Sequence, residues 1–252
     1  IPLRLVGSEM CIRDRSNLPK ALHKIAHAPL IAHAMQAAAP LDAQKTIVVV
    51  GHEADAVTEV AKEIDPDVLI VHQGTQLGTA HAVAQASPAL EGFEGDILVL
   101  YADTPFISQQ TMTNIQNARA DADLVILGFE AQDPGRYGRL VTNGAQLKRI
   151  VEFEDASDQE RAITLCNSGV LATSADDLFS MIKKIGNENA SGEFYLTDCV
   201  KLACQAGKTT TVVKCEEAET LGVNSRADLA RAEAAFQSCL LYTSDAADDT
   251  PC

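Results

Sequence analysis

The chain has 252 residues and a formal net charge of −15 at pH 7, with a pI near 4.7. This length can bury a sizeable core in one or two domains. The acidic balance argues against nucleic-acid and anionic-membrane partners, whose phosphates it would repel, but allows a small phosphorylated ligand in a locally positive pocket. No apolar run approaches the roughly 18 residues of a membrane span, and the seven cysteines show no metal-like spacing. We therefore expect a cytoplasmic protein with reduced thiols.

The two ends differ from the rest of the chain, and one DNA string accounts for both. Residues 239–244 read Cys-Leu-Leu-Tyr-Thr-Ser, which TGT CTC TTA TAC ACA TCT can encode. Residues 10–14 read Met-Cys-Ile-Arg-Asp, which the reverse complement of part of that string can encode. The string resembles the end of a transposon-based sequencing adapter. We therefore expect residues 1–15 and 239–252 to be non-native, adapter-derived segments, and residues 16–238 to form the domain.

Buried strands and amphipathic helices alternate along the first half of the sequence. Strand–helix–strand units of about 30 residues are typical of a doubly wound α/β fold. Leu18-Pro19-Lys20 opens this half with a basic cluster that includes His23 and Lys24, for which a solvated basic face is an equal alternative. Helices are predicted over 30–39, 54–64 and 79–86, and strands over 46–50, 68–71 and 97–101.

The run from Asp96 to Phe106 is the most informative strand. Residues 97–101 are apolar or aromatic without alternation, which suits a strand buried on both faces of a parallel sheet. Pro105 ends regular pairing, so Asp103 lies just past the carboxyl end of the strand. Ligands of open α/β sheets bind at that edge. Taken alone, Asp103 would more often be a solvated loop residue.

A second candidate loop, residues 73–81, follows a strand and opens a helix. Gly78 would allow a ligand to approach the backbone closely, and Thr79 is predicted to be the N-cap of the helix. Gln73 carries both donors and acceptors, which suits the recognition of a base or an amide. As a bare pattern this is weak, since an ordinary strand-to-helix turn would use the same residues.

The second half predicts one continuing domain with a small inserted β lobe around residues 135–170. A Gly- and Pro-rich loop with two arginines, residues 133–139, begins this lobe. The final helix has a start like a capping box at Ser225 to Asp228. Strands are expected over 124–129, 147–153, 162–172 (broken at 166–169) and 209–214, and helices over 109–118, 174–185, 198–206 and from 225.

Together and in this order, eight segments resemble the uridylyltransferase domain of bacterial N-acetylglucosamine-1-phosphate uridylyltransferases. The resemblance covers residues 16–238 and implies a Rossmann-like nucleotidyltransferase fold, with a mostly parallel sheet flanked by helices. It implies transfer of uridylyl from UTP to N-acetylglucosamine 1-phosphate, with Mg²⁺ as cofactor. The segments are LPKALHKI, QLGTAHAV, LVLYADTP, RYGRLV, IVEFEDA, CNSGV, NASGEFYLTD and GVNSRADL.

The resemblance also implies a role for each matching residue. Asp103 and Asn224 match the Mg²⁺ ligands, and Lys20 matches a catalytic lysine that contacts phosphate. Two oxygen ligands plus substrate phosphates is a common way for a protein to hold Mg²⁺. The matching substrate contacts are Gln73, Gly78 and Thr79 for the nucleotide, Tyr101 beside the metal, and Gly138, Glu152, Asn167 and Thr197 for the sugar.

The chain departs from the family pattern in places. The family carries a glycine-rich start of the type LAAGxGTRM directly before the segment that begins at Ser16, and residues 1–15 do not match it. We therefore expect impaired turnover, although Ile1 to Val6 could take the place of the first strand. Ala102 stands where the family usually has Gly. Full-length members are often bifunctional homotrimers through a C-terminal acetyltransferase domain, and this chain ends before any repeat of that kind.

Two alternatives remain open at this point. A nucleotidyltransferase for another sugar phosphate would share most of these motifs, and the set Gly138, Glu152 and Asn167 argues for an acetamido sugar instead. A non-catalytic nucleotide-binding module would share the fold. Such a module would have no need for both presumed metal ligands, Asp103 and Asn224.

Overall fold

The computed structural model describes residues 3–7, 18–51 and 54–248. Most of the two segments expected to be adapter-derived, including Arg15, lies outside the described residues or has no described side chains. Two parts of them have a described backbone: residues 3–7 form a strand, and residues 239–248 continue the last helix. No helix in the described part is long and apolar enough to cross a membrane.

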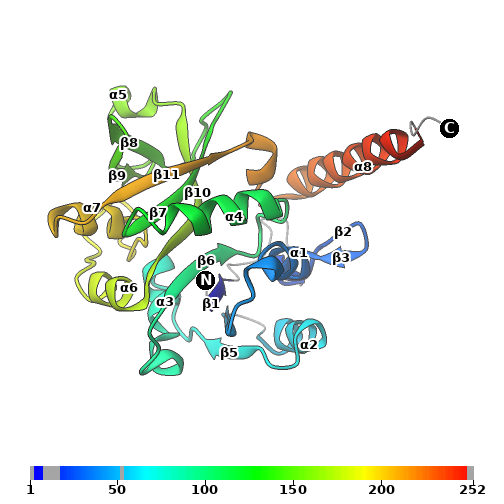
Figure 1. Ribbon diagram of the computed structural model, residues 1–252, viewed down its shortest axis with the longest axis horizontal. Coiled ribbons are helices and arrows are strands. Elements are labelled where there is room, and N and C mark those ends of the chain that lie inside the picture. Colours follow the sequence, from blue (N-terminus) through cyan, green and yellow to red (C-terminus); the bar gives the residue numbers. More distant parts are fainter. Residues whose placement is uncertain (1–2, 8–17, 52–53, 249–252) are drawn as a thin grey trace.

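A mixed sheet flanked by helices forms the centre of the fold (Figure 1). Along the main path of the sheet the strand order is β11-β7-β10-β6-β1-β4-β5, and β8 and β9 extend it from β10. The strands are β1 (Leu3–Gly7), β4 (Lys45–Val50), β5 (Leu69–His72), β6 (Asp96–Tyr101), β7 (Leu124–Glu130), β8 (Arg139–Asn143), β9 (Gln146–Val151), β10 (Leu165–Ser174) and β11 (Thr210–Cys215). A separate pair is formed by β2 (Lys24–Ile25) and β3 (Ala28–Pro29).

The expected α/β sheet is confirmed, with one element reversed inside it. Strands β1, β4, β5 and β6 pair in parallel, as do β7 and β11. Strand β10 runs antiparallel to both of its neighbours, β6 and β7. The expected lobe is the antiparallel hairpin of β8 and β9, attached to β10 through Cys166 and Arg139.

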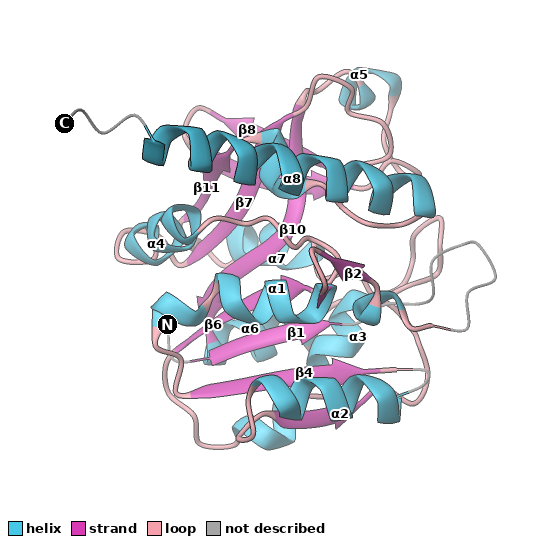
Figure 2. Cartoon of the chain, turned by 90° about the vertical axis from the view of Figure 1, so that its right-hand side faces the viewer, coloured by secondary structure: helices cyan, strands magenta, loops and turns pink. Residues whose placement is uncertain are grey.

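Helices cover both faces of the sheet (Figure 2). The α-helices are α1 (Leu30–Ala37), α2 (Ala54–Ile64), α3 (Thr79–Ala84), α4 (Gln109–Ala118), α5 (Asp158–Arg161), α6 (Ala175–Ile182), α7 (Asp198–Gln205) and α8 (Arg226–Asp248). Short 3₁₀ turns are η1 (Lys20–Leu22), η2 (Ala39–Leu41), η3 (Ser87–Leu90) and η4 (Glu217–Thr220).

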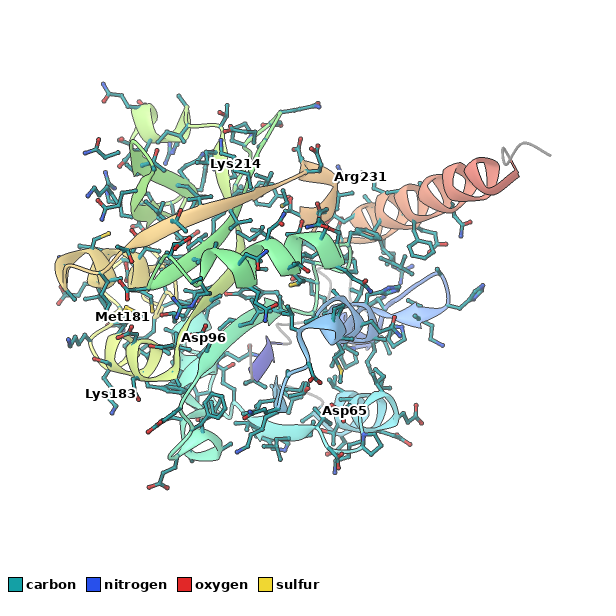
Figure 3. The ribbon with its side chains drawn as sticks, viewed as in Figure 1. Asp65, Asp96, Met181, Lys183, Lys214 and Arg231 are labelled. Atoms are coloured by element: carbon teal, nitrogen blue, oxygen red, sulfur yellow. The ribbon has the colours of Figure 1, made fainter. Side chains whose placement is uncertain are left out.

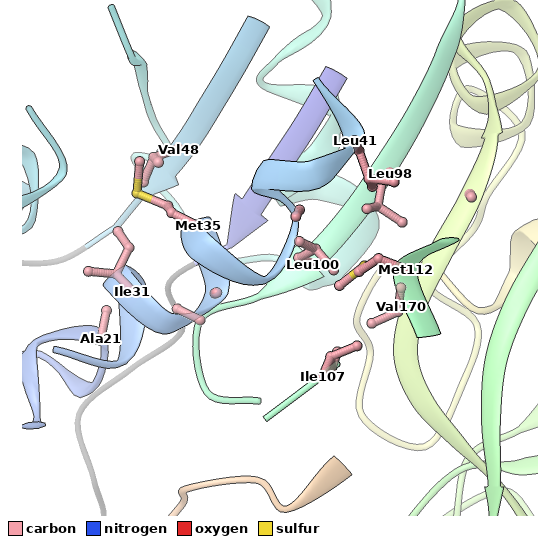
Figure 4. Close-up of a cluster of buried hydrophobic side chains, with 14 of the residues drawn as sticks. Ala21, Ile31, Met35, Leu41, Val48, Leu98, Leu100, Ile107, Met112 and Val170 are labelled. Atoms are coloured by element: carbon pink, nitrogen blue, oxygen red, sulfur yellow. The ribbon is translucent and has the colours of Figure 1, made fainter. Parts of the chain in front are cut away.

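Alternating strand residues divide the core into two layers. On β6, Leu98 and Leu100 pack with Met35 of α1 and Met112 of α4 (Figure 4), while Ile97 and Val99 face the other layer, which contains α3, α6 and α7. Because side chains alternate along a strand, a run of apolar residues without polar gaps fills both layers at once. The unbroken apolar run of β6 therefore places it at the centre of the sheet.

The two ends of β6 have different partners. Asp96, labelled in Figure 3, begins the strand and forms an ion pair with Arg119 at 2.6 Å. At the other end, the carbonyl of Tyr101 accepts hydrogen bonds from the backbone and the hydroxyl of Thr104, at 3.4 and 3.1 Å. This turn stops the strand and places Asp103 at the carboxyl edge of the sheet.

Candidate functional site

The turn after β6 brings three candidate residues together. The Lys20 ammonium contacts Asp103 Oδ2 and donates to Asn224 Oδ1 at 2.6 Å, although these residues are far apart in sequence. The backbone N–H of Val223 also donates to the Asp103 carbonyl at 3.0 Å. The Lys20 side chain is 9% exposed, so its charge is largely shielded from water and is balanced by Asp103. Lys20, Asp103 and Asn224, which the family resemblance assigns to the phosphates and the metal, therefore form one cluster in the structure.

The start of α8 positions Asn224. Ser225 Oγ accepts from the Asp228 backbone N–H at 3.1 Å, and the Asp228 carboxylate accepts from Asn224 N at 3.1 Å and from Ser225 Oγ at 2.8 Å. Burial acts against the charge of Asp228, but hydrogen bonds from Ser225, Arg231 and Asn224 outweigh it and lower the pKa of that carboxyl. The predicted cap is thus present, and its hydrogen bond to Asn224 N helps to orient Asn224 toward Asp103.

The oxygen atoms of this cluster suit a hard cation. Asp103 Oδ2 and Asn224 Oδ1 both converge on one positive group, the Lys20 ammonium. Carboxylate and amide oxygens are the ligands that divalent cations such as Mg²⁺ prefer. The residue set therefore fits the metal that the sequence led us to expect. Ala102 is buried without a positive φ, so this turn does not require the glycine that the family usually has there.

The expected nucleotide-side residues lie in the turn before α3. Gly78 has φ +113°, and a Cβ there would lie 2.6 Å from the Phe194 carbonyl, so glycine is required on both counts. Gln73 Nε2 lies 3.0 Å from His81 Nδ1, which places its amide beside this turn. The prediction that Thr79 is the N-cap is wrong: Gly78 is the cap, and Thr79 Oγ1 instead accepts from Leu196 N at 2.9 Å.

The expected sugar-side residues also lie together. Thr197 Oγ1 donates to Glu152 Oε1 at 3.0 Å, and the Glu152 carboxylate lies against Gly138. Asn167 N donates to the Gly138 carbonyl at 2.8 Å, and Asn167 Oδ1 accepts from Gly169 N at 3.0 Å. All four predicted residues are thus joined by direct contacts around the ends of β9 and β10.

Burial is the main electrostatic feature of the sugar side. It raises the pKa of Glu152, and the nearby charges of Glu154, Asp155 and Asp198 raise it further, while the hydrogen bond from Thr197 lowers it. Burial also raises the pKa of Asp198. The carboxylates here repel one another, so this part of the site favours uncharged hydroxyl groups as partners over a second anion.

Tyr101 connects the cluster of Lys20, Asp103 and Asn224 to the sugar-side residues. Gly169 has φ +93°, and a Cβ on it would lie 2.7 Å from Tyr101 Cε2, so the ring lies directly against the glycine backbone. Because Gly169 also donates to Asn167, the ring of Tyr101 fixes the irregular part of β10. The predicted residues are therefore linked partly by contacts and partly by short stretches of chain: Tyr101 is two residues before Asp103, and Leu196, which donates to Thr79, directly precedes Thr197.

Some residues of this region were not predicted from the sequence. Phe194 pairs through its backbone with the turn before α3, and Asp155 accepts from Ala190 N at 3.0 Å. A hollow of about 530 Å³ lies beside Glu152, with Asp155 and Tyr195 in its lining. The available signal was a single aromatic pair, Phe194-Tyr195, inside an otherwise polar loop.

Comparisons with known proteins agree on the kind of protein. A sequence model of the MobA-like NTP transferase domain matches residues 12–173. The bifunctional protein GlmU of Ruegeria sp. (strain TM1040) is 59% identical over 226 residues, which are 90% of this chain and 50% of that protein. GlmU of Cereibacter sphaeroides (strain ATCC 17025 / ATH 2.4.3) is 54% identical over 237 residues, covering 94% of this chain and 52% of that protein. The chain thus spans about half the length of the curated relatives it matches.

Solved structures share the fold at low sequence identity. The nucleoside-diphosphate-sugar pyrophosphorylase from Vibrio cholerae RC9 has a TM-score of 0.75 and 15% identity, over 92% of this chain and 99% of that one. A UDP-glucose pyrophosphorylase complexed with UDP-glucose has a TM-score of 0.71 and 17% identity, over 94% and 99% of the two chains. At such identities the likeness carries the fold alone.

Proposed function

Because the chain belongs to the MobA-like NTP transferase family, we propose that it transfers the uridylyl group of UTP to N-acetylglucosamine 1-phosphate. The products are UDP-N-acetylglucosamine, a precursor of the bacterial cell envelope, and pyrophosphate. The sequence resemblance to bacterial N-acetylglucosamine-1-phosphate uridylyltransferases supports this choice of substrates. The observation that carries it is that contacts and short stretches of chain link the Lys20 cluster to the sugar-side and nucleotide-side residues.

The reaction needs positioning and charge stabilisation more than proton transfer. An oxygen of the sugar phosphate attacks the α-phosphorus of UTP in line. The bond from that phosphorus to the β-phosphate oxygen breaks, and pyrophosphate leaves with the electron pair. The attacking phosphate is already ionised at neutral pH, so the step requires neither a general base nor a covalent enzyme intermediate.

Lys20 supplies the positive charge for this step. Its ammonium reaches the cluster at the edge of the sheet, where it offsets the charge that grows on the α-phosphate oxygens. Asp103 and Asn224 would hold a divalent cation, which we expect to be Mg²⁺ and which neutralises phosphate charge when bound. The cluster at the end of β6 thus serves the phosphates.

The sugar then contacts the sugar-side residues, and the nucleoside contacts the nucleotide-side residues. Glu152 accepts hydrogen bonds from sugar hydroxyls, and Asn167 and Gly138 recognise the N-acetyl group. Thr197 holds the Glu152 carboxylate in place through its hydroxyl. The uracil and its ribose contact one turn, formed by Gln73, Gly78 and Thr79.

The test measures pyrophosphate release with UTP, Mg²⁺ and N-acetylglucosamine 1-phosphate. We expect Asp103→Asn to lower kcat at least about 100-fold, the usual effect of removing one group that stabilises the transition state. Asp65→Asn is the matched control, because Asp65, labelled in Figure 3, lies in the turn after α2 and outside the cluster, and its contact to Asp67 N is one that asparagine can keep. Equal activity with glucose 1-phosphate would contradict the proposed substrate, and equal kcat in both variants would contradict the role of Asp103.

A further inference from the structure

The segment between α6 and α7 contacts both halves of the proposed site. We refer to residues 187–197 as the strap; they contain no helix or strand. The backbone of Phe194 pairs with the nucleotide-side turn in two directions, since its N–H donates to the Leu77 carbonyl at 2.8 Å and its carbonyl accepts from Ala80 N at 2.9 Å. The strap is therefore attached by backbone hydrogen bonds to the two residues that enclose Gly78 and Thr79.

The other attachments of the strap are on the sugar side. Ala190 N donates to Asp155 Oδ1 at 3.0 Å, and Thr197 at the end of the strap donates to Glu152 Oε1 at 3.0 Å. Glu152 and Asp155 belong to the segment that directly follows β9. The same short piece of chain thus connects the sugar-side carboxylate to the nucleotide-side turn.

The strap has its own internal support, centred on Asn189. Asn189 Oδ1 accepts from the backbone N–H groups of Ser191 and Glu193, both at 3.2 Å, and its Nδ2 donates to the Glu193 carbonyl at 2.6 Å. Asn187 Nδ2 adds a bond to the Gly192 carbonyl at 3.3 Å. These bonds close the loop upon itself, between the contact of Ala190 to Asp155 and the backbone pairing of Phe194.

A ligand on the sugar side would touch the strap directly. The lining of the hollow of about 530 Å³ beside Glu152 includes the end of β9, Asp155, and Asn187, Asn189 and Tyr195 of the strap. A ligand that orders one wall of this hollow reduces the freedom that remains for the turn before α3. Binding of the nucleoside then requires less ordering of the turn before α3, so the two ligands would bind with positive coupling.

We propose that the strap couples the sugar-phosphate and nucleoside halves of the site, and that Asp155 is the positioning residue that anchors it. This inference rests on the proposed function and adds that the two halves bind cooperatively. Asp155 is exposed and acts through Ala190 N. An asparagine at this position keeps an acceptor oxygen for Ala190, whereas an alanine has none.

The experiment measures the affinity for N-acetylglucosamine 1-phosphate by calorimetry, with and without saturating uridine. Uridine carries no phosphate, so no reaction takes place and no charge repulsion enters. We expect uridine to tighten sugar-phosphate binding about fivefold or more in the unaltered chain and in Asp155→Asn. In Asp155→Ala we expect the factor to fall toward one, since only the contact of Thr197 to Glu152 still attaches the strap on the sugar side. Asp158→Ala is the matched control, since Asp158 is fully exposed and its ion-pair partner is Arg161, outside the strap.

Three outcomes would overturn the inference in different ways. A coupling factor in Asp155→Ala equal to that of the unaltered chain removes Asp155 from the mechanism. Independent binding of both ligands to the unaltered chain removes the strap and leaves the proposed function standing. If neither ligand binds the unaltered chain, the proposed function fails, and this inference with it.

A second readout separates positioning from a general loss of structure. Hydrogen exchange at the Ala190 amide should slow when either ligand binds to the unaltered chain and to Asp155→Asn, and should not slow in Asp155→Ala. A merely structural role for Asp155 would weaken both affinities and lower Tm without changing the coupling factor. Unchanged exchange at Ala190 in every variant would contradict the anchoring contact.

Discussion

At the scale of single residues, Glu152 is a carboxyl whose burial opposes its charged form, and its proposed function is to accept hydrogen bonds from the sugar. It is half-buried, and burial together with Glu154, Asp155 and Asp198 raises its pKa above the ordinary value of 4.5. A carboxyl whose pKa is higher in the folded state stabilises the fold fully below its unfolded pKa. That contribution is lost as the pH rises through the folded pKa. Above its folded pKa, the folded chain therefore bears the cost of an ionised, half-buried Glu152 carboxylate.

Because the pKa of Glu152 is raised in the folded state, we predict that Glu152→Gln stabilises the chain at neutral pH. Glutamine can still accept from Thr197 but carries no charge, so we expect Tm at pH 7.5 to rise by about 2–4 °C for each kcal/mol gained. The gain in Tm should shrink as the pH falls toward about 4.5. The same substitution should lower the affinity for the sugar phosphate. Melting curves across this range test it, with Glu63→Gln as the control, since Glu63 is exposed on α2 and its charge is not among those that shift Glu152. A gain that stays constant with pH would show that ionisation of Glu152 is not its cause.

At the scale of elements, the β8–β9 lobe depends on one buried cation. Arg139 is 2% exposed, and its guanidinium donates to the carbonyls of Gly135 at 3.0 Å and Pro134 at 3.2 Å, and to Arg161 at 3.3 Å. It also contacts the Tyr137 carbonyl. The carbonyls of Pro134, Gly135 and Tyr137 lie in the turn before Gly138, so a single side chain holds the backbone that the proposed N-acetyl recognition uses.

We expect Arg139→Met to lower the free energy of unfolding by about 3 kcal/mol or more, because hydrogen bonds from a charged donor contribute about 1.5–3 kcal/mol each. The KM for the sugar phosphate should rise while the KM for UTP stays close to that of the unaltered chain. Urea unfolding and steady-state kinetics measure the two effects. Arg136→Met is the matched control: Arg136 also faces the Phe153 ring, but its side chain is 74% exposed. A similar loss in both variants would point to the aromatic contact instead of the carbonyls.

The lobe also shows what the sequence could and could not predict. The buried runs of β4 and β6 and the periodicity of α2 and α4 are local signals, and the predicted ranges agree with the structure to within about a residue. Strand β8 was not predicted, although Asn143-Gly144 is a known hairpin signal between it and β9. The placement of β10 between β6 and β7 depends on long-range pairing, which no local pattern encodes.

The same distinction applies to the candidate site. Asp103 was singled out because an apolar strand ends in front of it, which is a local signal, whereas Asn224 was named through the family resemblance. The grouping of Lys20 with these two residues came from the family resemblance alone. Neither route predicted the strap, since its attachments to Asp155 and to the turn before α3 join segments distant in sequence.

At the scale of the whole molecule, the proposed site lies where several parallel strands end together. Strand β1 lies between β4 and β6, and its last residue, Gly7, pairs with Tyr101 at the carboxyl edge of the sheet. Residues 3–7 thus take the central position that the sequence left open for a first strand. In the sequence, residues 8–17 stand between β1 and the segment that carries Lys20, and the family resemblance led us to expect a glycine-rich start in this stretch.

This arrangement predicts that the expected impairment can be relieved without touching the sheet. Replacing residues 8–15 by a family-type glycine-rich loop, with β1 retained, should raise the rate of pyrophosphate release by about 100-fold or more, because backbone N–H groups of such a loop can hold the triphosphate. The control is a loop of the same composition in shuffled order, which keeps the length and flexibility but not the geometry. Equal rates for the two loops would show that residues 8–15 do not limit turnover. A higher rate only with the ordered loop, abolished again by Asp103→Asn, would tie the gain to the cluster at the end of β6.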